Sequence, residues 1–236
     1  SVTNTSKLPA GASSTLVSLV STDTLTNKTL TSPVINSPSG DFIKIQGTNF
    51  TDSLLVGHAT HGTLNAASRN TGVGIDALDA LTSGDQNTAL GNKAITKVDS
   101  GSNNTSIGYK SGENLTSGGQ NTYVGDSTSR KNVTGSNNAS FGYTTLEGAT
   151  NQSHSFNSAF GSSSLKAVTT GGRNIGIGYQ AGDNITSGSG NIIIGSVDAA
   201  AADSARTLKI AGNDGSTTTT WISGDSSGNL VTPGTI

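Results

Sequence analysis

The sequence predicts an all-β protein built as a parallel β-roll, or β-solenoid, of about ten 17-residue coils. Three observations support this prediction. A motif Asn-x-x-(large apolar)-Gly recurs along most of the 236-residue chain, each coil holds two large apolar residues, and Ser, Thr, Asn and Gly fill most other positions. A short motif at a constant period is typical of architectures in which small units stack on one another.

The composition excludes several classes of protein. Hydrophobic residues reach only 31%, charged residues 12%, and the net charge is −2. These values leave either a disordered polar chain or a repetitive β fold with a thin core.

The absence of Cys excludes disulfides, Cys-based zinc sites and a thiol nucleophile. The net charge does not favour nucleic-acid binding. The longest aliphatic run, residues 192–194, is far below the roughly 20 residues of a membrane span, so we expect no membrane insertion. The chain starts without Met, so we expect a processed product or a fragment.

The repeat decides in favour of the ordered alternative. Its spacing is 17 residues, except for one 19-residue step between Asn138 and Asn157. A further step of 17 residues at each end adds two Gly residues in register. The Asn residues that begin the motif are Asn70, Asn87, Asn104, Asn121, Asn138, Asn157, Asn174 and Asn191. The Gly residues that end it are Gly57, Gly74, Gly91, Gly108, Gly125, Gly142, Gly161, Gly178, Gly195 and Gly212.

The fourth position of the motif predicts the first strand of each coil. It holds Val56, Val73, Leu90, Ile107, Val124, Phe141, Phe160, Ile177, Ile194 and Ala211. Because alternate residues of a strand face one side, we expect these side chains to fill the interior. The Gly that follows marks a bend where a Cβ would clash or where φ must be positive.

A second apolar column, the twelfth position, predicts the second strand and the second turn. It consists of Leu64, Leu81, Val98, Leu115, Val168 and Ile185, mostly followed by Thr-Ser-Gly or a close relative. The eighth position stays small throughout, with Thr60, Ala77, Ala94, Ser111, Thr128, Thr145, Ser164 and Ala181. Each coil is therefore expected to be a flattened unit of two short strands and two turns.

The energetics predict that such rolls pack against one another. Ten coils about 4.8 Å apart make a rod of roughly 45–50 Å. Two buried apolar side chains, at about 1.5–3 kcal/mol each, barely offset the ordering of 17 residues.

Stacking itself is supported by the tenth position, where acidic residues occupy alternate coils and like charges are not direct neighbours. This position reads Asp79, Thr96, Glu113, Arg130, Glu147, Lys166 and Asp183.

The chain changes character on both sides of the repeat domain, residues 53–212. Residues 1–52 are rich in Ser and Thr and contain three of the four Pro residues, which predicts an extended attachment or shaft segment. Within it, Phe42, Ile43 and Ile45 are expected to form a first strand. The Ala-rich stretch 197–206 suggests one or two helical turns. Residues 213–236, which include the only Trp, are expected to cap the open end of the roll.

Few residues suggest chemistry. His58 and His61 are the only close pair of candidate metal ligands, but no third ligand is identifiable and a solvent-facing turn explains them. Asp76 and Asp79 are the nearest candidates for a glycosidase pair, although such a pair should interrupt the repeat rather than follow it. No nucleophile elbow with acid and His partners is present. We therefore expect no enzyme activity, no catalytic residues, no metal and no cofactor.

Three tyrosines are candidates for receptor binding. Tyr109, Tyr143 and Tyr179 occupy the sixth position of alternate coils and are separated by Asp126 and Ser162. An aromatic strip of this kind suits a host-surface glycan or protein. The alternative is that the three rings pack against a neighbouring chain or coil, because aromatic residues commonly fill interfaces.

The units Asn87–Gly91, Asn104–Gly108 and Asn138–Gly142 resemble the head repeats of YadA-like trimeric autotransporter adhesins. This resemblance covers roughly residues 53–212 and implies a left-handed parallel β-roll, three chains side by side and binding to host surfaces. Nothing in the chain resembles the stalk or the membrane anchor of that family. Residues 23–36 are similar instead to segments of bacteriophage tail-fibre and virion-appendage proteins, and residues 221–225 resemble the C-terminal regions of those proteins.

The resemblance implies a homotrimeric virion protein that displays a rigid roll for host attachment. Such a phage fibre, spike or capsid decoration would lie on the virion surface and join another virion protein through residues 1–52. Two alternatives stay open. One is the head of a bacterial trimeric surface adhesin on the extracellular bacterial surface. The other is a polysaccharide-degrading tailspike, which predicts an acid-lined cleft that interrupts the repeat.

Overall fold

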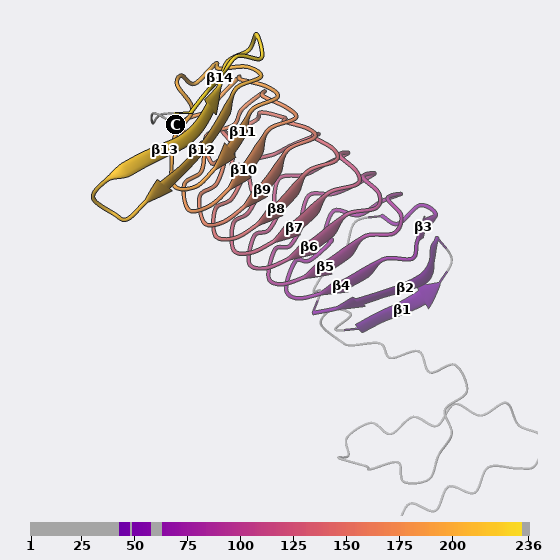
Figure 1. Ribbon diagram of the computed structural model, residues 1–236. Coiled ribbons are helices and arrows are strands. Elements are labelled where there is room, and N and C mark those ends of the chain that lie inside the picture. The colour runs from indigo at the N-terminus through magenta and orange to yellow at the C-terminus, as the bar shows by residue number, and fades with distance from the viewer. Residues whose placement is uncertain (1–42, 48, 58–62, 233–236) are drawn as a thin grey trace, which may run out of the picture. The chain divides into compact units, whose positions relative to one another are not determined.

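A computed structural model describes residues 43–232 with the exception of 48 and 58–62. Most of the expected attachment segment, the strand residue Phe42, and also His58, Thr60 and His61, therefore lie outside the described residues. The described strands belong to one sheet (Figure 1). They are β1 (Ile43–Gly47), β2 (Phe50–Val56), β3 (Ala67–Ser68), β4 (Thr71–Val73), β5 (Thr88–Leu90), β6 (Thr105–Ile107), β7 (Thr122–Val124), β8 (Ala139–Phe141), β9 (Ser158–Phe160), β10 (Ile175–Ile177), β11 (Ile192–Ile194), β12 (Leu208–Asn213), β13 (Thr218–Gly224) and β14 (Leu230–Val231).

The expected all-β parallel solenoid is confirmed for the described residues. From β2 through β4 to β12, each strand pairs in parallel with the strand of the next coil, so that the coils stack along one axis (Figure 1). Leu54, for example, pairs with Thr71, and Thr71 with Thr88. The 19-residue coil keeps this register, because Ala139 pairs with Ser158. The two additional residues are therefore accommodated outside the sheet.

Each regular coil has one strand rather than the expected two. The opposite side consists of stacked turns held by backbone hydrogen bonds between coils, such as Ile95 N–H to Ser111 O at 2.9 Å. Residues at the seventh and ninth positions adopt left-handed dihedrals, as Asp76 and Leu78 do with φ of 59°. Alternating left-handed residues are incompatible with extended β geometry, so this side cannot form a regular strand. Nothing in the apolar pattern distinguishes stacked turns from a short strand.

The expected inward orientation of the fourth position is wrong. Leu90 is 49% exposed and Phe160 is 41% exposed, whereas the third position is buried in every coil from Leu55 to Ile193. The first position, Asn, is also buried. Because side chains of a strand alternate, burial of the first and third positions requires that the second and fourth face outward.

The interior is filled by the third, ninth and twelfth positions, which compensate one another in size. Gly72 faces Leu78: a Cβ on Gly72 would lie 2.6 Å from Leu55 Cδ2 and 3.2 Å from Leu78 Cδ1. Gly112, at the ninth position, leaves room in the same way for Ile95 and Tyr123. Of the predicted second apolar column, Leu81, Val98, Leu115, Val168 and Ile185 are buried. Small and large residues thus interdigitate between neighbouring coils, as close packing requires.

The Asn column forms a buried ladder of amides. The side chain of Asn104 donates to Asn87 Oδ1 at 3.0 Å and to Gly118 O at 2.9 Å. Its own Oδ1 accepts the backbone and side-chain N–H groups of Asn121. Hydroxyl groups end the ladder: Ser53 Oγ accepts from Asn70, and Thr207 Oγ1 donates to Asn191. Every side-chain polar atom of an interior Asn is therefore satisfied, as burial demands.

The Gly column is required by both conformation and space. Gly91 has φ of 136°, and a Cβ on it would lie 2.5 Å from the carbonyl oxygen of Gly108 in the next coil. The column runs from Gly57 to Gly195. The expected tenth member, Gly212, is not part of it, because the last step is 16 residues and Ile192 pairs with Leu208. Ala211 O lies against Gly195, which places Ala211 in the register of the Gly column.

Antiparallel strands close both ends of the sheet. β1 pairs antiparallel with β2, in agreement with the strand expected around Ile43 and Ile45. At the other end, β12, β13 and β14 form an antiparallel meander. The parallel stack therefore gives way to antiparallel pairing at both ends. The helical turns expected at 197–206 are absent: this stretch is irregular and spans the shortened last coil.

Candidate binding surfaces

The outer sheet face, defined as the second and fourth positions of β2 and of β4 to β12, exposes large apolar side chains along the described stack. It carries Thr, Ala or Ser at the second position in the central coils and Ile towards the C-terminal end. The fourth position is apolar in every coil, and no charged residue occurs at either position. Phe141 and Phe160 stack on this face with ring centroids 4.9 Å apart. Their exposure is not needed to form the coil, since the interior is filled by other positions.

The three tyrosines belong to a longer row at the sixth position, which we call the alternating row. Ile75, Tyr109, Tyr143 and Tyr179 are 62%, 48%, 60% and 60% exposed. The polar residues Asn92, Asp126, Ser162 and Ser196 occupy the coils between and after them. The row is held in register by its backbone: Tyr109 O accepts the N–H of Ser127 at 2.8 Å, and Asp126 O accepts that of Thr144 at 3.0 Å. The sequence pointed to the tyrosines, whereas the structure shows that Ile75 at the same position is exposed as well.

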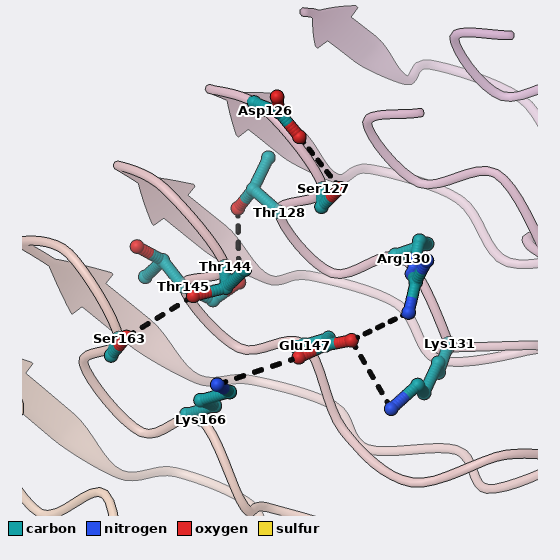
Figure 2. Close-up of polar contacts among 10 residues, drawn as sticks. All are labelled: Asp126, Ser127, Thr128, Arg130, Lys131, Thr144, Thr145, Glu147, Ser163 and Lys166. Carbon is teal, nitrogen blue, oxygen red and sulfur yellow. Dashed lines mark hydrogen bonds and ion pairs between the residues drawn. The ribbon is translucent and has the colours of Figure 1, made fainter. Parts of the chain in front are cut away.

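The tenth position forms the expected ladder of opposite charges in the middle of the stack. Glu147 lies between Arg130 and Lys166 of the neighbouring coils, with N–O distances of 2.8 and 3.9 Å, and Lys131 is 3.1 Å away (Figure 2). Burial alone would raise the pKa of Glu147, but Lys131 and Arg130 outweigh this effect and hold the pKa below its usual value. The cluster therefore joins three coils electrostatically.

Two carboxyl groups break this alternation near the C-terminal end. Asp183 lies within hydrogen-bonding reach of Asp198, which the tenth-position pattern did not predict. Partial burial and the hydrogen bond and charge of Asp198 raise the pKa of Asp183 to about 6, and Lys166 partly opposes this rise. The two carboxyl groups lie within hydrogen-bonding reach, whereas glycosidase carboxyls stand about 5 Å or more apart.

A polar section interrupts the apolar core in the 19-residue coil. His154 is buried, and neither ring nitrogen makes a well-formed hydrogen bond with any described residue. Its burial lowers the pKa to about 4, although the nearby backbone of Leu146 slightly favours the protonated form. Close by, Asn132 donates to the buried Tyr123 hydroxyl at 3.0 Å. The pKa of Tyr123 is raised because burial disfavours the phenolate.

The other residues considered for chemistry do not form a recognisable site. Asp76 and Asp79 are partly buried in a regular coil, and the backbone carbonyl of Asp76 accepts the Thr96 hydroxyl at 2.8 Å. His58 and His61 lie outside the described residues. Among the described residues no group of three or more His, Cys, Asp or Glu side chains is arranged to hold a metal ion. The same part of the chain contains no helix of the length and apolarity needed to cross a membrane.

A cavity of about 500 Å³ lies where the last coil meets the C-terminal meander. Ile193 and Ala199 contribute its apolar wall, and Lys209, Ser223 and Asp225 its polar rim. Ile193 belongs to the interior column, so the cavity is the incompletely filled end of the core.

Comparison with known proteins adds no further information: the chain matches no family model, no curated protein and no solved structure. Functional assignment therefore depends on the surfaces described above.

Proposed function

We propose that the chain is a structural virion protein, a phage fibre, spike or capsid decoration, that assembles as a side-by-side homotrimer and displays a rigid rod for host-surface attachment. Residues 1–52 would join it to another virion protein, and the rod would present its exposed side to a host glycan or protein. The proposal requires no catalytic step and no cofactor.

The observation that carries the proposal is the apolar outer sheet face. Leu90, Ile107, Phe160, Ile177 and Ile192 are between 37% and 49% exposed on a single continuous surface. Patches of this extent on a polar protein mark interaction sites. Nine steps of about 4.8 Å give the face a length of roughly 43 Å.

Further copies of the same chain are the occupants that fit this face best. Each copy has the same rise per coil, so that apolar rows of adjacent copies coincide along the whole length. The face carries no charge that would have to be desolvated. A closed cyclic arrangement covers the face on every copy, whereas an unclosed one would leave it exposed and promote fibres. Three copies are proposed because of the resemblance of the repeats to trimeric heads.

The virion location is favoured over a bacterial adhesin by the flanking segments. Residues 23–36 and 221–225 are the parts similar to virion-appendage proteins. A degrading tailspike is less favoured, because Asp183 and Asp198, a carboxyl pair that interrupts the regular pattern in the described residues, are within hydrogen-bonding reach of each other. Attachment rather than hydrolysis is therefore the proposed role.

The test of assembly is a charge placed on the outer sheet face. The purified chain should have three times the monomer mass by light scattering, and Ile107→Glu combined with Ile177→Glu should give a monomer with unchanged β circular dichroism at low temperature. Thr170→Glu adds one negative charge at an exposed position outside the sheet and should leave the trimer intact. A wild-type chain that is monomeric at micromolar concentration would refute the assembly.

The test of location is immunogold labelling of purified particles and of bacterial cells. Label on particle appendages is expected. Label on cells that carry no particles would instead favour the adhesin.

A further inference from the structure

The alternating row has a spacing that restricts the ligand it can bind. Its exposed apolar residues occur on every second coil, which separates Tyr109, Tyr143 and Tyr179 by about 9.6 Å per step along the stack. The backbone hydrogen bonds between coils fix this separation, because the carbonyl groups of Tyr109 and Tyr143 accept from Ser127 and Ser163 at 2.8 and 2.9 Å. The spacing therefore cannot adapt to a ligand, and the ligand must match it.

The polar residues between the rings provide hydrogen-bonding groups at the intermediate steps. Asp126 is exposed, and its Oδ1 accepts the Ser127 hydroxyl at 2.6 Å, which leaves further acceptor capacity on the carboxylate (Figure 2). Ser162 has the equivalent position between Tyr143 and Tyr179. The row thus alternates an aromatic surface with a hydrogen-bonding group at each strand spacing of about 4.8 Å.

We propose that the alternating row binds an extended polysaccharide of β-1,4-linked pyranose rings that runs along the stack of coils. Every second sugar ring stacks on Tyr109, Tyr143 or Tyr179, and the rings between them hydrogen-bond to Asp126 and Ser162. This inference rests on the proposed attachment function and names the class of receptor. A β-1,4-linked chain is straight, and its successive rings advance by about one strand spacing, so stacking and hydrogen bonding stay in register over several sugars.

Other extended polymers do not match the row. An extended peptide returns a side chain to the same face every two residues, at about 6.6 Å, and would lose register with rings about 9.6 Å apart. An α-1,4-linked glucan curls into a helix and cannot contact three collinear rings. Aromatic rings provide a large apolar area at low entropic cost, which suits the apolar face of a pyranose.

The proposal is tested by calorimetric titration of the full chain with chitohexaose and cellohexaose. At least one of them should bind, and the corresponding trisaccharide should bind at least about tenfold more weakly, because it reaches at most two rings of the row. Maltohexaose, of the same length but α-linked, should not bind detectably.

Substitutions then locate the binding site. Tyr143→Ala should weaken hexasaccharide binding about tenfold or more, whereas Tyr143→Phe keeps the ring and should retain the affinity within about twofold. The triple variant Tyr109→Ala, Tyr143→Ala and Tyr179→Ala should abolish detectable binding. Trp221→Ala removes an exposed aromatic ring outside the row and should have no effect.

Several outcomes would overturn the proposal. They are a wild-type chain that binds neither β-linked hexasaccharide, binding that is unaffected by Tyr143→Ala, and binding that does not distinguish β from α linkage. A change of mass in light scattering on Tyr143→Ala would assign the row to an interface between chains. An intact trimer that binds no glycan overturns this inference alone, while a monomeric wild-type chain overturns the proposed assembly.

Discussion

At the scale of the residue, the space for one Cβ atom determines which side chains the repeat tolerates. The Gly that ends each motif is fixed by two independent constraints. In Gly125, φ is 137°, which side chains rarely adopt, and a Cβ would lie 2.7 Å from the carbonyl carbon of Gly142. Any larger residue must therefore strain the backbone and displace the next coil.

The corresponding prediction concerns Gly125→Val. We expect the free energy of unfolding to fall by about 3 kcal/mol or more, since backbone strain and overpacking each cost about 1–3 kcal/mol. Thermal unfolding followed by circular dichroism measures the effect. Gly215→Ala is the matched control, because Gly215 has φ of 95° but no atom near its Cβ position. It should cost only about 1 kcal/mol. Equal losses for the two variants would show that contact between coils does not constrain Gly125.

At the scale of the element, the coil depends on polar groups as much as on apolar ones. The strands β5 to β11 have only three residues each, too short to be stable as isolated pairs. The Asn ladder runs beside them and links each coil to the next through a buried side chain. Loss of one Asn breaks bonds to two coils and leaves buried groups without partners.

Asn104→Ala tests this ladder. Two donated bonds are lost, and two N–H groups of Asn121 lose their acceptor, so we expect a destabilisation of about 3 kcal/mol. Chemical denaturation gives the value. Asn114→Ala, in the same coil, removes only an exposed bond with Lys97 and should cost about 0.5 kcal/mol or less. A similar small loss for Asn104→Ala would contradict the structural role of the ladder.

At the scale of the whole molecule, the core is divided into two parts. One apolar cluster extends from Phe50 to Tyr123 and another from Leu146 to Ala199. Between them lie buried polar residues, including Asn132, Ser140 and His154. Since each coil contacts only its neighbours, we expect this section to be the weakest point of the stack.

Acid should destabilise the stack at this point. The pKa of His154 is about 4 in the folded chain, below the 6.5 of an unperturbed His, so folding favours the neutral ring. The free energy of unfolding that the neutral His154 ring contributes is fully present above pH 6.5. It is lost as the pH falls toward 4, by about 3 kcal/mol at pH 4. Denaturation at pH 7, 5.5 and 4 should show this decline. The raised pKa of Asp183 has the opposite effect on stability. The stabilisation that comes from the protonated Asp183 carboxyl is lost as the pH rises through about 6.

His154→Gln separates the two effects. It removes the titrating ring, so that most of the decline in stability between pH 6.5 and 4 should disappear, whereas Asp183→Asn should leave the decline in place. An unchanged pH profile in His154→Gln would exclude His154 as the cause.

Sequence reasoning reached the fold through the period but misjudged the interior. The phased Gly residues and the apolar twelfth position predict stacked coils, because both depend on local geometry that each repeat must satisfy. The large residues at the fourth position were expected inside. The buried Asn at the first position excludes this by alternation, but its burial cannot be recognised until its partners, such as Gly118 O, are known.

The candidate binding residues were also predicted only in part. The sequence shows that Tyr109, Tyr143 and Tyr179 share one column, whereas their exposure, and that of Ile75, depends on the direction of the turn after each Gly. The pair Asp183 and Asp198 was not predicted because Asp198 belongs to the shortened last coil, where the 17-residue register no longer applies.

By itself the sequence determined the period, the parallel stacking and the columns, because a regular repeat places equivalent residues at equivalent heights. Only the tertiary structure decided which columns face inward. That choice depends on how third- and ninth-position side chains fill the space between coils and on where the Asn amides find partners. As a result, the largest apolar column lies on the outer sheet face, where the described residues leave much of it exposed.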